Sequence, residues 1–398
     1  MTTTSSCPAC GAATGEPFLR WPAVPVHSCL LVSTETEARE FPRGDLALVF
    51  CRACGFIYNA AFDPAHTSYS PDYEETQGFS PRFQAFARDL AARWVGAYHL
   101  KGGSVVEIGC GKGEFLVHMA EAGVGQAVGV DPGIHPERVS SAAADRITWV
   151  KGFFPEDYPG TGAPLGADAV VCRHTLEHID AVARFVGQVR DAIADRPETV
   201  VLFELPDVRR VLEEGAFWDV YYEHCSYFSA GSLGRLFRSH GFDVLNLTRA
   251  YDDQYLLLEA RLAQSGPPRP HPLEEDVAVL ERGVAHFQTV FDDVIERWRT
   301  RIGEVTGTGG RVVIWGSGSK GVAFLAALGE AAARVEVAVD INPYKHGKYL
   351  AGTGHLIVGP EYLTEHPPAL VVVMNPVYLE EITADLRRLG VEAAVEAL

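Results

Sequence analysis

Short apolar runs alternate with longer segments of helical periodicity over residues 104–203. The apolar runs are predicted strands, and segments with apolar residues three and four positions apart, such as 115–120, are predicted helices. In chain order the pattern predicts a strand from 104, a helix, a strand at 127–130, a helix, strands at 147–150 and 168–172, a helix at 178–195 and a strand at 199–203. This alternation predicts an α/β domain whose mostly parallel sheet is covered by helices on both faces.

A second, shorter α/β pattern lies near the C-terminus. The proline-rich stretch 264–272 is a predicted linker, and apolar positions at helical spacing predict a long helix over 273–305. Strands are then predicted at 312–315, 335–339 and 370–374, with a helix at 322–328. Only about 90 residues remain for this unit, so we expect half of a Rossmann fold. The predicted parts of the chain are therefore residues 1–62, 63–263, 264–306 and 307–398.

Length and charge restrict the classes of protein to consider. A chain of 398 residues is too long for one ordinary core. Its 34 basic and 52 acidic residues give a net charge of −18, which argues against nucleic acid and membrane surfaces as partners, because both are anionic. The sequence contains no run of ~18 apolar residues, and residues 1–6 lack the features of a signal peptide. We therefore expect a cytoplasmic protein with reduced cysteines that acts on a small molecule; its oligomeric state is not predicted.

The glycine loop after the first predicted strand is the clearest candidate for a ligand site. Its glycines are Gly109, Gly111 and Gly113, and Glu107 lies near the end of the strand. Strand, glycine turn and helix together open nucleotide sites in α/β sheets, since glycine lets the backbone turn sharply and approach a ligand. Asp131 ends the next strand, where a carboxylate can accept hydrogen bonds from ribose hydroxyls. S-adenosylmethionine (SAM) is a nucleoside without phosphate, so the loop predicts a SAM site.

Two other interpretations fit the same loop. A dinucleotide fold prefers the spacing GxGxxG, whereas the third glycine here falls one position earlier. A glycine turn that binds nothing is the other interpretation. Because the strand, the loop, the helix and the acid all agree with a nucleoside site, SAM is the ligand we predict.

Two CxxCG motifs predict a metal site near the N-terminus. Their cysteines are Cys7, Cys10, Cys51 and Cys54. Two such pairs supply the four thiolates of a structural zinc site, and four thiolates leave no open coordination position for catalysis. The 40 residues between Cys10 and Cys51 exceed the ~15–20 of a compact site, so we expect an inserted loop or small sheet. Cys29 and His27 lie in this insertion as spare ligands, and four unligated cysteines are the alternative.

A polar and aromatic segment precedes the central sheet. Residues 70–80 include Tyr73, and Tyr69 lies just before them. A polar loop with tyrosines ahead of a cofactor domain is placed to act as a lid, and Tyr73 is then the candidate substrate contact. Packing at a seam between domains explains the same residues equally well. Pro81 is predicted to begin a helix after this segment.

Side chains at the ends of the other strands extend the candidate site, because the carboxyl ends of parallel strands share one edge of a sheet. Phe153, after the strand at 147–150, is placed to cover an adenine. Arg173 and His174 follow the strand at 168–172, where the methionine end of SAM is expected. We assign Glu177 and His178 to the start of a helix rather than to the site.

The densest polar and aromatic stretch of the chain is 217–228, which holds six aromatic residues. Its candidate functional residues are Tyr221, Tyr222, Glu223 and His224. His224 is the candidate general base, because the pKa of histidine lies near neutral. Glu223 can orient or charge-stabilise such a base, and a phenol can donate a hydrogen bond to a developing oxyanion. Cys225 is not assigned as a nucleophile, since methyl transfer needs none.

The second glycine loop matches GxGxxG with Gly316, Gly318 and Gly321, and Asp340 ends the following strand. Taken alone, this is a NAD signature. A local basic cluster made by Lys320, Lys345 and Lys348 also belongs to this unit. A helix N-terminus, glycine amides and lysines together predict a diphosphate site. Asn375 follows the last predicted strand at the same sheet edge and is a further substrate candidate; a purely structural docking domain is the alternative.

These motifs together resemble the SAM-dependent C-methyltransferases of sugar nucleotides, and the resemblance covers nearly the whole chain. The paired CxxCG motifs look like that family's N-terminal zinc module. Residues 107–113 and 130–132, the latter ending in Pro132, look like its SAM motifs. Residues 221–229 look like its Tyr-x-Glu-His-x-Ser-Tyr-Tyr/Phe-Ser active-site signature, which is the most specific match. The loop at 316–321 and the segment 339–349 look like its C-terminal module.

The resemblance implies a class I methyltransferase Rossmann-like sheet with an N-terminal zinc-binding module and a smaller C-terminal Rossmann-like domain. That domain would bind the nucleotide half of the substrate rather than NAD. His224 would act as the base, supported by Tyr221 and Glu223, and a carbon next to a carbonyl would be methylated. Two segments depart from the family's sugar enzymes, which often have Pro-Trp-Asn near 374–378 and a Tyr- and Ser-rich loop near 73–78.

Three alternative functions remain open at this point. O-methylation would use the same cofactor and the same base, His224. An NAD-dependent oxidoreductase would use Gly316, Gly318, Gly321 and Asp340, but no hydride acceptor site is evident near that loop. A non-catalytic adaptor would have a zinc module and a degenerate SAM fold, although Glu107, Asp131 and His224 are present together.

Overall fold

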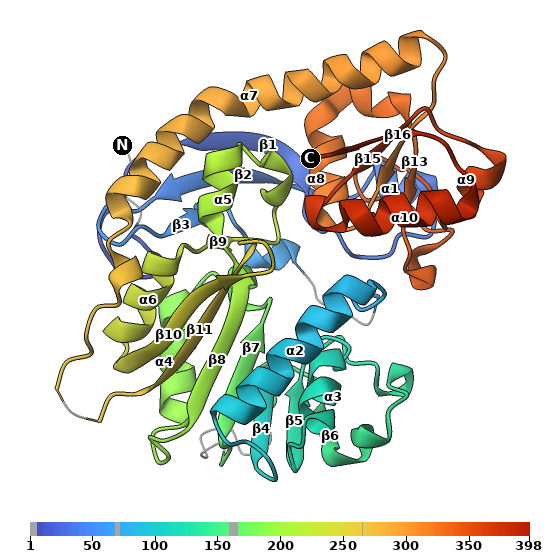
Figure 1. The fold of residues 1–398 in the computed structure, drawn as a ribbon. Coiled ribbons are helices and arrows are strands. Elements are labelled where there is room, and N and C mark those ends of the chain that lie inside the picture. The colour runs from blue at the N-terminus through green and yellow to red at the C-terminus, as the bar shows by residue number, and fades with distance from the viewer. Residues whose placement is uncertain (1–5, 68–71, 159–165, 265) are drawn as a thin grey trace.

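The computed structural model describes residues 6–67, 72–158, 166–264 and 266–398, which contain three β-sheets connected by helices (Figure 1). Among the described residues, no helix combines the length and the apolar character needed to cross a bilayer.

The central seven-stranded sheet has the strand order β10-β11-β8-β7-β4-β5-β6. Its strands are β4 (Ser104–Ile108), β5 (Gln126–Val130), β6 (Ile147–Val150), β7 (Ala169–Arg173), β8 (Val200–Pro206), β10 (Phe242–Ala250) and β11 (Tyr255–Leu262). Strands β8, β7, β4, β5 and β6 lie side by side in this order and pair in parallel. Strand β11 lies between β8 and β10 and is antiparallel to both. The strand order reverses at β4, between β5 and β7, and such a switch point opens a ligand crevice at the carboxyl ends of the strands.

Helices cover both faces of the central sheet. The buried side chains of α2 (Pro81–Ala97) and α3 (Glu114–Glu121) form one hydrophobic core with it. Those of α4 (Val182–Ala192) and α6 (Ala230–Ser239) form another. The helix predicted from 178 begins later, because a single 3₁₀ turn, Leu176–His178, precedes α4.

The N-terminal four-stranded sheet has the order β1-β2-β3-β9 and is antiparallel throughout. Its strands are β1 (Leu19–Pro25), β2 (Arg43–Phe50), β3 (Ile57–Asn59) and β9 (Ser226–Tyr227), and the short helix α1 (Glu35–Arg39) lies between the first two in sequence. Because β9 directly follows His224 and Cys225 in the chain, this sheet incorporates the segment that we expected to carry the base. The main-chain N–H of Asn59 also donates to the carbonyl of Cys225 at 2.9 Å.

The C-terminal unit contains a parallel five-stranded sheet of order β14-β13-β12-β15-β16. Its strands are β12 (Val312–Trp315), β13 (Val335–Val339), β14 (Ile357–Val358), β15 (Leu370–Val373) and β16 (Ala394–Ala397), and its helices are α8 (Ser319–Leu328), α9 (Tyr362–Glu365) and α10 (Leu379–Leu389). The switch of strand order at β12 places the second glycine loop, like the first, at the carboxyl edge of its sheet.

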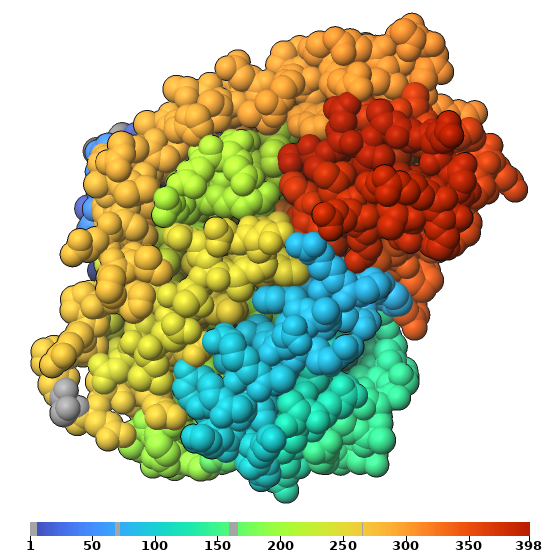
Figure 2. All heavy atoms as spheres, in the orientation of Figure 1, coloured from blue at the N-terminus to red at the C-terminus, as the bar shows by residue number. Residues whose placement is uncertain are grey.

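The long helix α7 (Val277–Gly307) arches from the N-terminal sheet to the C-terminal unit (Figure 1). Its apolar residues, together with those of α5 (Val208–Glu214), join both regions in one hydrophobic core. On the opposite side, α2 meets the C-terminal unit directly (Figure 2). There the Ser80 hydroxyl donates to the carboxylate of Glu381 on α10 at 3.0 Å. This hydrogen bond connects the central domain to the C-terminal unit.

Candidate active site

One large cavity of ≈1340 Å³ lies between the carboxyl edge of the central sheet and the C-terminal unit. Its walls include both glycine loops, residues 73 and 75–80, and His224. A pocket for one drug-sized ligand usually measures roughly 300–1,000 Å³, so this cavity has room for a cofactor and a second molecule. The predicted cofactor residues that line it are Glu107, Gly109, Gly111, Asp131, Pro132, Phe153, Arg173 and His174.

The first glycine loop requires glycine for its backbone and for its packing. Gly109 and Gly113 have φ angles of +70° and +81°, which favour glycine. A Cβ atom at Gly109 would lie 2.0 Å from the Thr175 hydroxyl, and one at Gly113 would lie 2.2 Å from the ring of Trp149. The close approach therefore involves Trp149 of β6 and Thr175, just after β7.

Two carboxylates at the ends of β4 and β5 give this part of the cavity its acidic character. Burial raises the pKa of Glu107 to about 8 against the opposing charge of Arg173, and its Oε2 atom has no hydrogen-bond partner. Asp131 accepts main-chain hydrogen bonds from Gly111 at 3.0 Å and from Gly133 at 2.6 Å. SAM carries a sulfonium and an ammonium group, so a buried acceptor without a partner fits such a cationic ligand.

A buried chain of charges runs along the strand ends beneath the cavity. Glu204 accepts a hydrogen bond from Arg173 Nε at 2.6 Å and lies 3.1 Å from His174 Nε2. Burial alone would lower the pKa of His174, but the carboxylates of Glu204 and Glu177 outweigh it and raise this pKa to about 9. The guanidinium of Arg173 also stacks 4.0 Å from the ring of Phe115. Arg173 and His174 are therefore both charged at neutral pH and are held in place by carboxylates.

The raised pKa of His174 predicts how stability depends on pH. A group whose pKa is higher in the folded than in the unfolded protein stabilises the fold below its unfolded value, about 6.5, and loses this effect as pH rises. The free energy of unfolding should therefore fall between pH 6.5 and about 9, and less steeply in His174→Gln. Chemical denaturation across this range measures both slopes, and an NMR titration should find one imidazole that titrates near pH 9 only in the wild type. Equal slopes would contradict the charged state of His174.

His224 and Tyr221 form a hydrogen-bonded pair in the cavity wall. The Tyr221 hydroxyl lies 2.8 Å from His224 Nε2, and the ring centroids are 4.1 Å apart. Burial, with the nearby charges of His178, His174 and Lys320, holds the pKa of His224 well below its usual range. Burial also holds the pKa of Tyr221 well above its usual range. The imidazole is therefore neutral and the phenol protonated, as a base and a hydrogen-bond donor require.

The structure places Glu223 and Tyr222 differently from the sequence-based expectation. The Glu223 carboxylate accepts hydrogen bonds from the main chain and the hydroxyl of Ser28 and lies 2.9 Å from His27 Nδ1. It holds the N-terminal segment in place and does not touch the His224 imidazole. Tyr222 is buried, and its hydroxyl accepts a hydrogen bond from the Asp63 N–H at 2.9 Å, so it lies away from the cavity. These two side chains therefore support the fold of the site.

Glu177 and His178 line the cavity, although they also form the 3₁₀ turn Leu176–His178 before α4, in line with their assignment to a helix start. A carboxylate oxygen of Glu177 and a ring nitrogen of His178 lie within 4.8 Å of each other and of a ring nitrogen of His224. The His178 ring lies 4.9 Å from that of His224, and its Nδ1 atom is 3.0 Å from the carbonyl of Glu223. The available signal was their position directly after a strand end that already carried Arg173 and His174.

The lysines of the C-terminal unit do not converge on one point. Lys320 lines the cavity and is paired with Asp219. Lys345 is buried 3.4 Å from Asp340, and Lys348 lies outside the cavity, where it donates to Ser33 at 3.1 Å. Lys320, at the N-terminus of α8, and Lys345 both line the cavity, whereas Lys348 does not, so at most two of the three predicted lysines face a ligand there.

Asp340 and Asn375 are likewise occupied by protein contacts. Asp340 accepts hydrogen bonds from the Ser317 N–H and hydroxyl at 3.0 and 2.5 Å, in addition to its pairing with Lys345. An NAD ribose would have to compete with these partners. The Asn375 amide lines the cavity but exchanges two hydrogen bonds, each of 3.0 Å, with Gln254 on the opposite side. Asn375 therefore joins the two α/β units.

Tyr73 lies in the cavity wall with its ring 6.0 Å from that of His27, whereas Tyr69 lies outside the described residues. The main chain of Tyr73 forms a β-bridge with Leu30. The segment around Tyr73 therefore connects the N-terminal region to the cavity, which fits both a lid and a seam between domains.

The four cysteines of the CxxCG motifs come together at one point. Their sulfur atoms lie within 4.8 Å of one another, with Cys7–Cys54 and Cys10–Cys51 distances of 3.7 Å. A tetrahedral zinc ion with Zn–S bonds of about 2.3 Å has sulfur–sulfur edges of about 3.8 Å. The thiolates therefore fit this ion. The spare candidates lie elsewhere, because Cys29 is next to Ser319 at 3.5 Å and His27 is next to Glu223.

Comparisons with known proteins cover most of the chain. A family described as "Methyltransferase domain" matches residues 79–247, and another described as "C-methyltransferase C-terminal domain" matches residues 274–394. The chain is 31% identical over 305 residues to the C-methyltransferase NovU of Streptomyces niveus, a match that spans 74% of this chain and 71% of NovU.

Solved structures match the chain over about half its length. A putative S-adenosylmethionine dependent methyltransferase from Listeria monocytogenes is 13% identical over 44% of this chain and 100% of its own, with a TM-score of 0.34. The mitomycin 7-O-methyltransferase MmcR is 20% identical over 50% of this chain and 62% of its own, with a TM-score of 0.37.

Proposed function

The chain belongs to the SAM-dependent C-methyltransferases, and from this premise we propose that it methylates a carbon next to a carbonyl group, in a ketosugar linked to a nucleotide. The observation that carries this proposal is the neutral His224, paired with Tyr221, in the same cavity as the first glycine loop. A carbon acid next to a carbonyl needs such a base, because the methyl group can be accepted only after a proton has left the carbon.

The proposed mechanism assigns one task to each residue of the pair. SAM, when bound, supplies an electrophilic methyl group on its sulfonium. His224 takes the proton from the acceptor carbon, for which its low pKa leaves it neutral and ready at neutral pH. Tyr221 stays protonated, and by turning its hydroxyl from His224 Nε2 to the carbonyl oxygen it would free the imidazole nitrogen for the carbon-bound proton and donate a hydrogen bond to the developing negative charge. Glu107 and Asp131 are the proposed cofactor contacts at the ends of β4 and β5.

The nucleotide half of the acceptor is proposed to occupy the C-terminal side of the cavity. The N-terminus of α8 has no side-chain cap and opens into the cavity together with Lys320. Helix N-termini attract anions through their free N–H groups and dipole. A diphosphate there would have to replace Asp219 as the partner of Lys320, so its binding would include the cost of breaking that ion pair.

We also propose that the four cysteines hold a structural zinc ion, in line with their sulfur–sulfur distances. In this scheme residues 1–62 bind the metal, 63–263 bind SAM and carry the base, 264–306 link the units, and 307–398 bind the nucleotide.

O-methylation stays the second candidate because His224 would serve a hydroxyl acceptor equally well. The NAD-dependent alternative is not carried forward. Asp340 is committed to Ser317 and Lys345, and the region around it matches a C-methyltransferase domain.

The reaction is tested with the purified protein, SAM and a panel of nucleotide-linked ketosugars in deuterated water. We expect mass spectrometry to find one product with an added methyl group, and deuterium exchange at the acceptor carbon that depends on His224. A methyl group on oxygen without carbon exchange would favour O-methylation. Calorimetric titration should show binding of S-adenosylhomocysteine (SAH) and none of NAD, and the reverse result would refute the methyltransferase proposal.

A further inference from the structure

Residues 72–80, which we name the strap, cross the first glycine loop. The carbonyl of Tyr73 accepts a hydrogen bond from Lys112 at 2.7 Å. Glu75 lies over Gly111, where an added Cβ would come 2.7 Å from Glu75 Oε1, and the Thr76 hydroxyl bonds Glu114 at 2.5 Å. The strap therefore contacts the loop at residues 73 and 75 and the start of α3 at residues 76 and 78, and residues 73 and 75–80 line the cavity.

Lys112 is the connection between the strap and two cofactor loops. It lies between Gly111 and Gly113, yet only 5% of its surface is exposed. Its ammonium donates to the carbonyls of Tyr73 and Gly133, the latter at 3.1 Å, and lies 3.8 Å from Glu75 Oε2. A buried ammonium is costly unless such partners surround it. One cation therefore joins the glycine loop, the loop after Asp131 and the strap.

Glu75 shows that this cation matters to the electrostatics of the strap. Burial raises the pKa of Glu75 to about 7, Lys112 opposes that rise, and the charge of Asp131 adds to it. Without the ammonium, Glu75 would face Asp131 with no compensating charge between them.

Glu74 attaches the strap to the acceptor side of the cavity. The Glu74 N–H donates to the carbonyl of Cys29 at 2.8 Å. Its buried carboxylate accepts two hydrogen bonds from Arg138, at 2.7 and 3.1 Å, and one from Asn342 of the C-terminal unit at 2.9 Å. Ser28, next to Cys29, bonds Glu223, the neighbour of the proposed base. Movement of the strap would therefore reach the acceptor half of the cavity.

We propose that Lys112 is a positioning residue that couples cofactor binding to the placement of the strap, and with it Tyr73. The inference rests on the proposed SAM site and adds an order of events. A nucleoside on the glycine loop and at Asp131 restrains two of the three segments that Lys112 joins. The ammonium passes this restraint to the main chain of Tyr73, so the acceptor side is organised after the cofactor has bound. Such coupling is reciprocal, so an ordered strap also holds the cofactor more tightly.

The test is amide hydrogen exchange of peptides from the strap, measured by mass spectrometry with and without SAH. In the wild type we expect SAH to slow exchange over residues 72–80 by about tenfold, a typical size for coupling between sites. Lys112→Met keeps the length and packing of the side chain but has no donor. This variant should bind SAH in calorimetry more weakly by no more than about tenfold, because the coupling is reciprocal, while the slowing over the strap is lost.

Lys101→Met, which removes an exposed lysine of the same domain, is the matched control and should behave like the wild type. Exchange over β8, a buried strand of the central sheet, reports whether Lys112→Met has folded. Wild-type protein that binds SAH without slower exchange of the strap overturns the proposal, whatever the variant does. Full slowing in Lys112→Met also overturns it. Failure of the wild type to bind SAH would instead refute the cofactor assignment on which the proposal rests.

Discussion

Replacing His224 by glutamine is expected to reduce kcat for methyl transfer by about 10²–10⁴-fold, the usual contribution of a general base. Glutamine keeps a polar side chain of similar size but cannot take the proton from carbon. Burial and the nearby positive charges hold the pKa of His224 well below its usual range, so the imidazole is neutral before the reaction and can accept a proton. Turnover is measured by the SAH that is formed, and calorimetry with SAH should find binding unchanged.

His286→Gln is the matched control, because His286 is exposed on α7 and does not line the cavity. It should keep full turnover. Solvent deuterium should enter the acceptor carbon with this control and the wild type, but not with His224→Gln. Wild-type turnover in His224→Gln would remove the base from the mechanism.

Tyr221→Phe should have a smaller effect than the loss of His224. The two side chains share one hydrogen bond, so removing the phenol leaves the base in place. Because residues that act as a unit are not additive, the double variant should be little worse than His224→Gln alone.

The sequence predicted the central sheet and its glycine loop well, since both depend on local patterns. Apolar runs mark β4 to β8 because buried parallel strands must be apolar throughout. The glycines of the loop report positive φ angles and close packing, both of which are properties of the residue itself. The four cysteines were also recognisable, because the CxxCG spacing fixes the geometry of each pair.

Other site residues depend on contacts between distant segments, which a single sequence does not record. Tyr221 and Tyr222 are neighbours, yet one lines the cavity and the other packs against the N-terminal region, because 217–228 has no regular period that would predict the facing of each side chain. Lys345 and Lys348 were predicted to form a cluster with Lys320, but Lys345 pairs with Asp340 and Lys348 donates a hydrogen bond to Ser33. Lys112 was not among the predicted site residues, because its contact with Tyr73 joins segments far apart in the chain.

Replacing Cys51 by serine is expected to remove the metal and to destabilise the whole chain, not only its N-terminal module. A structural zinc site contributes an apparent binding free energy of about 10–16 kcal/mol, which is comparable with the total stability of a domain, about 5–15 kcal/mol. A hydroxyl is a much poorer ligand than a thiolate, so most of this contribution should be lost.

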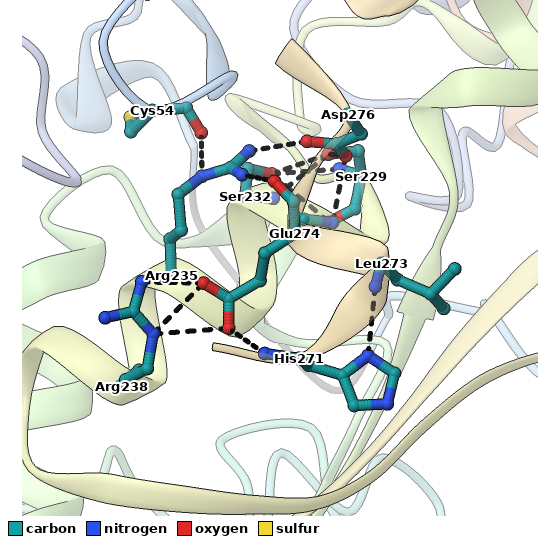
Figure 3. A network of polar contacts seen from close by, with 10 residues as sticks. Cys54, Ser229, Ser232, Arg235, Arg238, His271, Leu273, Glu274 and Asp276 are labelled. Atoms are coloured by element: carbon teal, nitrogen blue, oxygen red, sulfur yellow. Dashed lines mark hydrogen bonds and ion pairs between the residues drawn. The ribbon is translucent and has the colours of Figure 1, made fainter. Parts of the chain in front are cut away.

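Two contacts carry the damage beyond the metal site. Strand β3, which follows Cys54, pairs with β9 directly after the proposed base. Arg235 on α6 donates from Nε to the carbonyl of Cys54 at 2.9 Å and bonds Asp276, just before α7, at 2.6 Å (Figure 3). Arg238 and Glu274 extend this network on the same helix and linker. Hydrogen bonds therefore connect the CxxCG motif at residues 51–55 to the segment that follows His224 and to the start of α7.

Metal analysis of the wild type should therefore find about one zinc per chain, and Cys51→Ser should have little zinc and a lower Tm. Its residual folded fraction should lose turnover more than SAH binding, because the proposed base directly precedes β9 of the N-terminal sheet, whereas the glycine loop belongs to another sheet. Cys172→Ala is the control, since Cys172 is buried in β7 outside the cluster and should keep its zinc. A full complement of zinc in Cys51→Ser, or loss of zinc with an unchanged Tm, would contradict a structural role for the four thiolates.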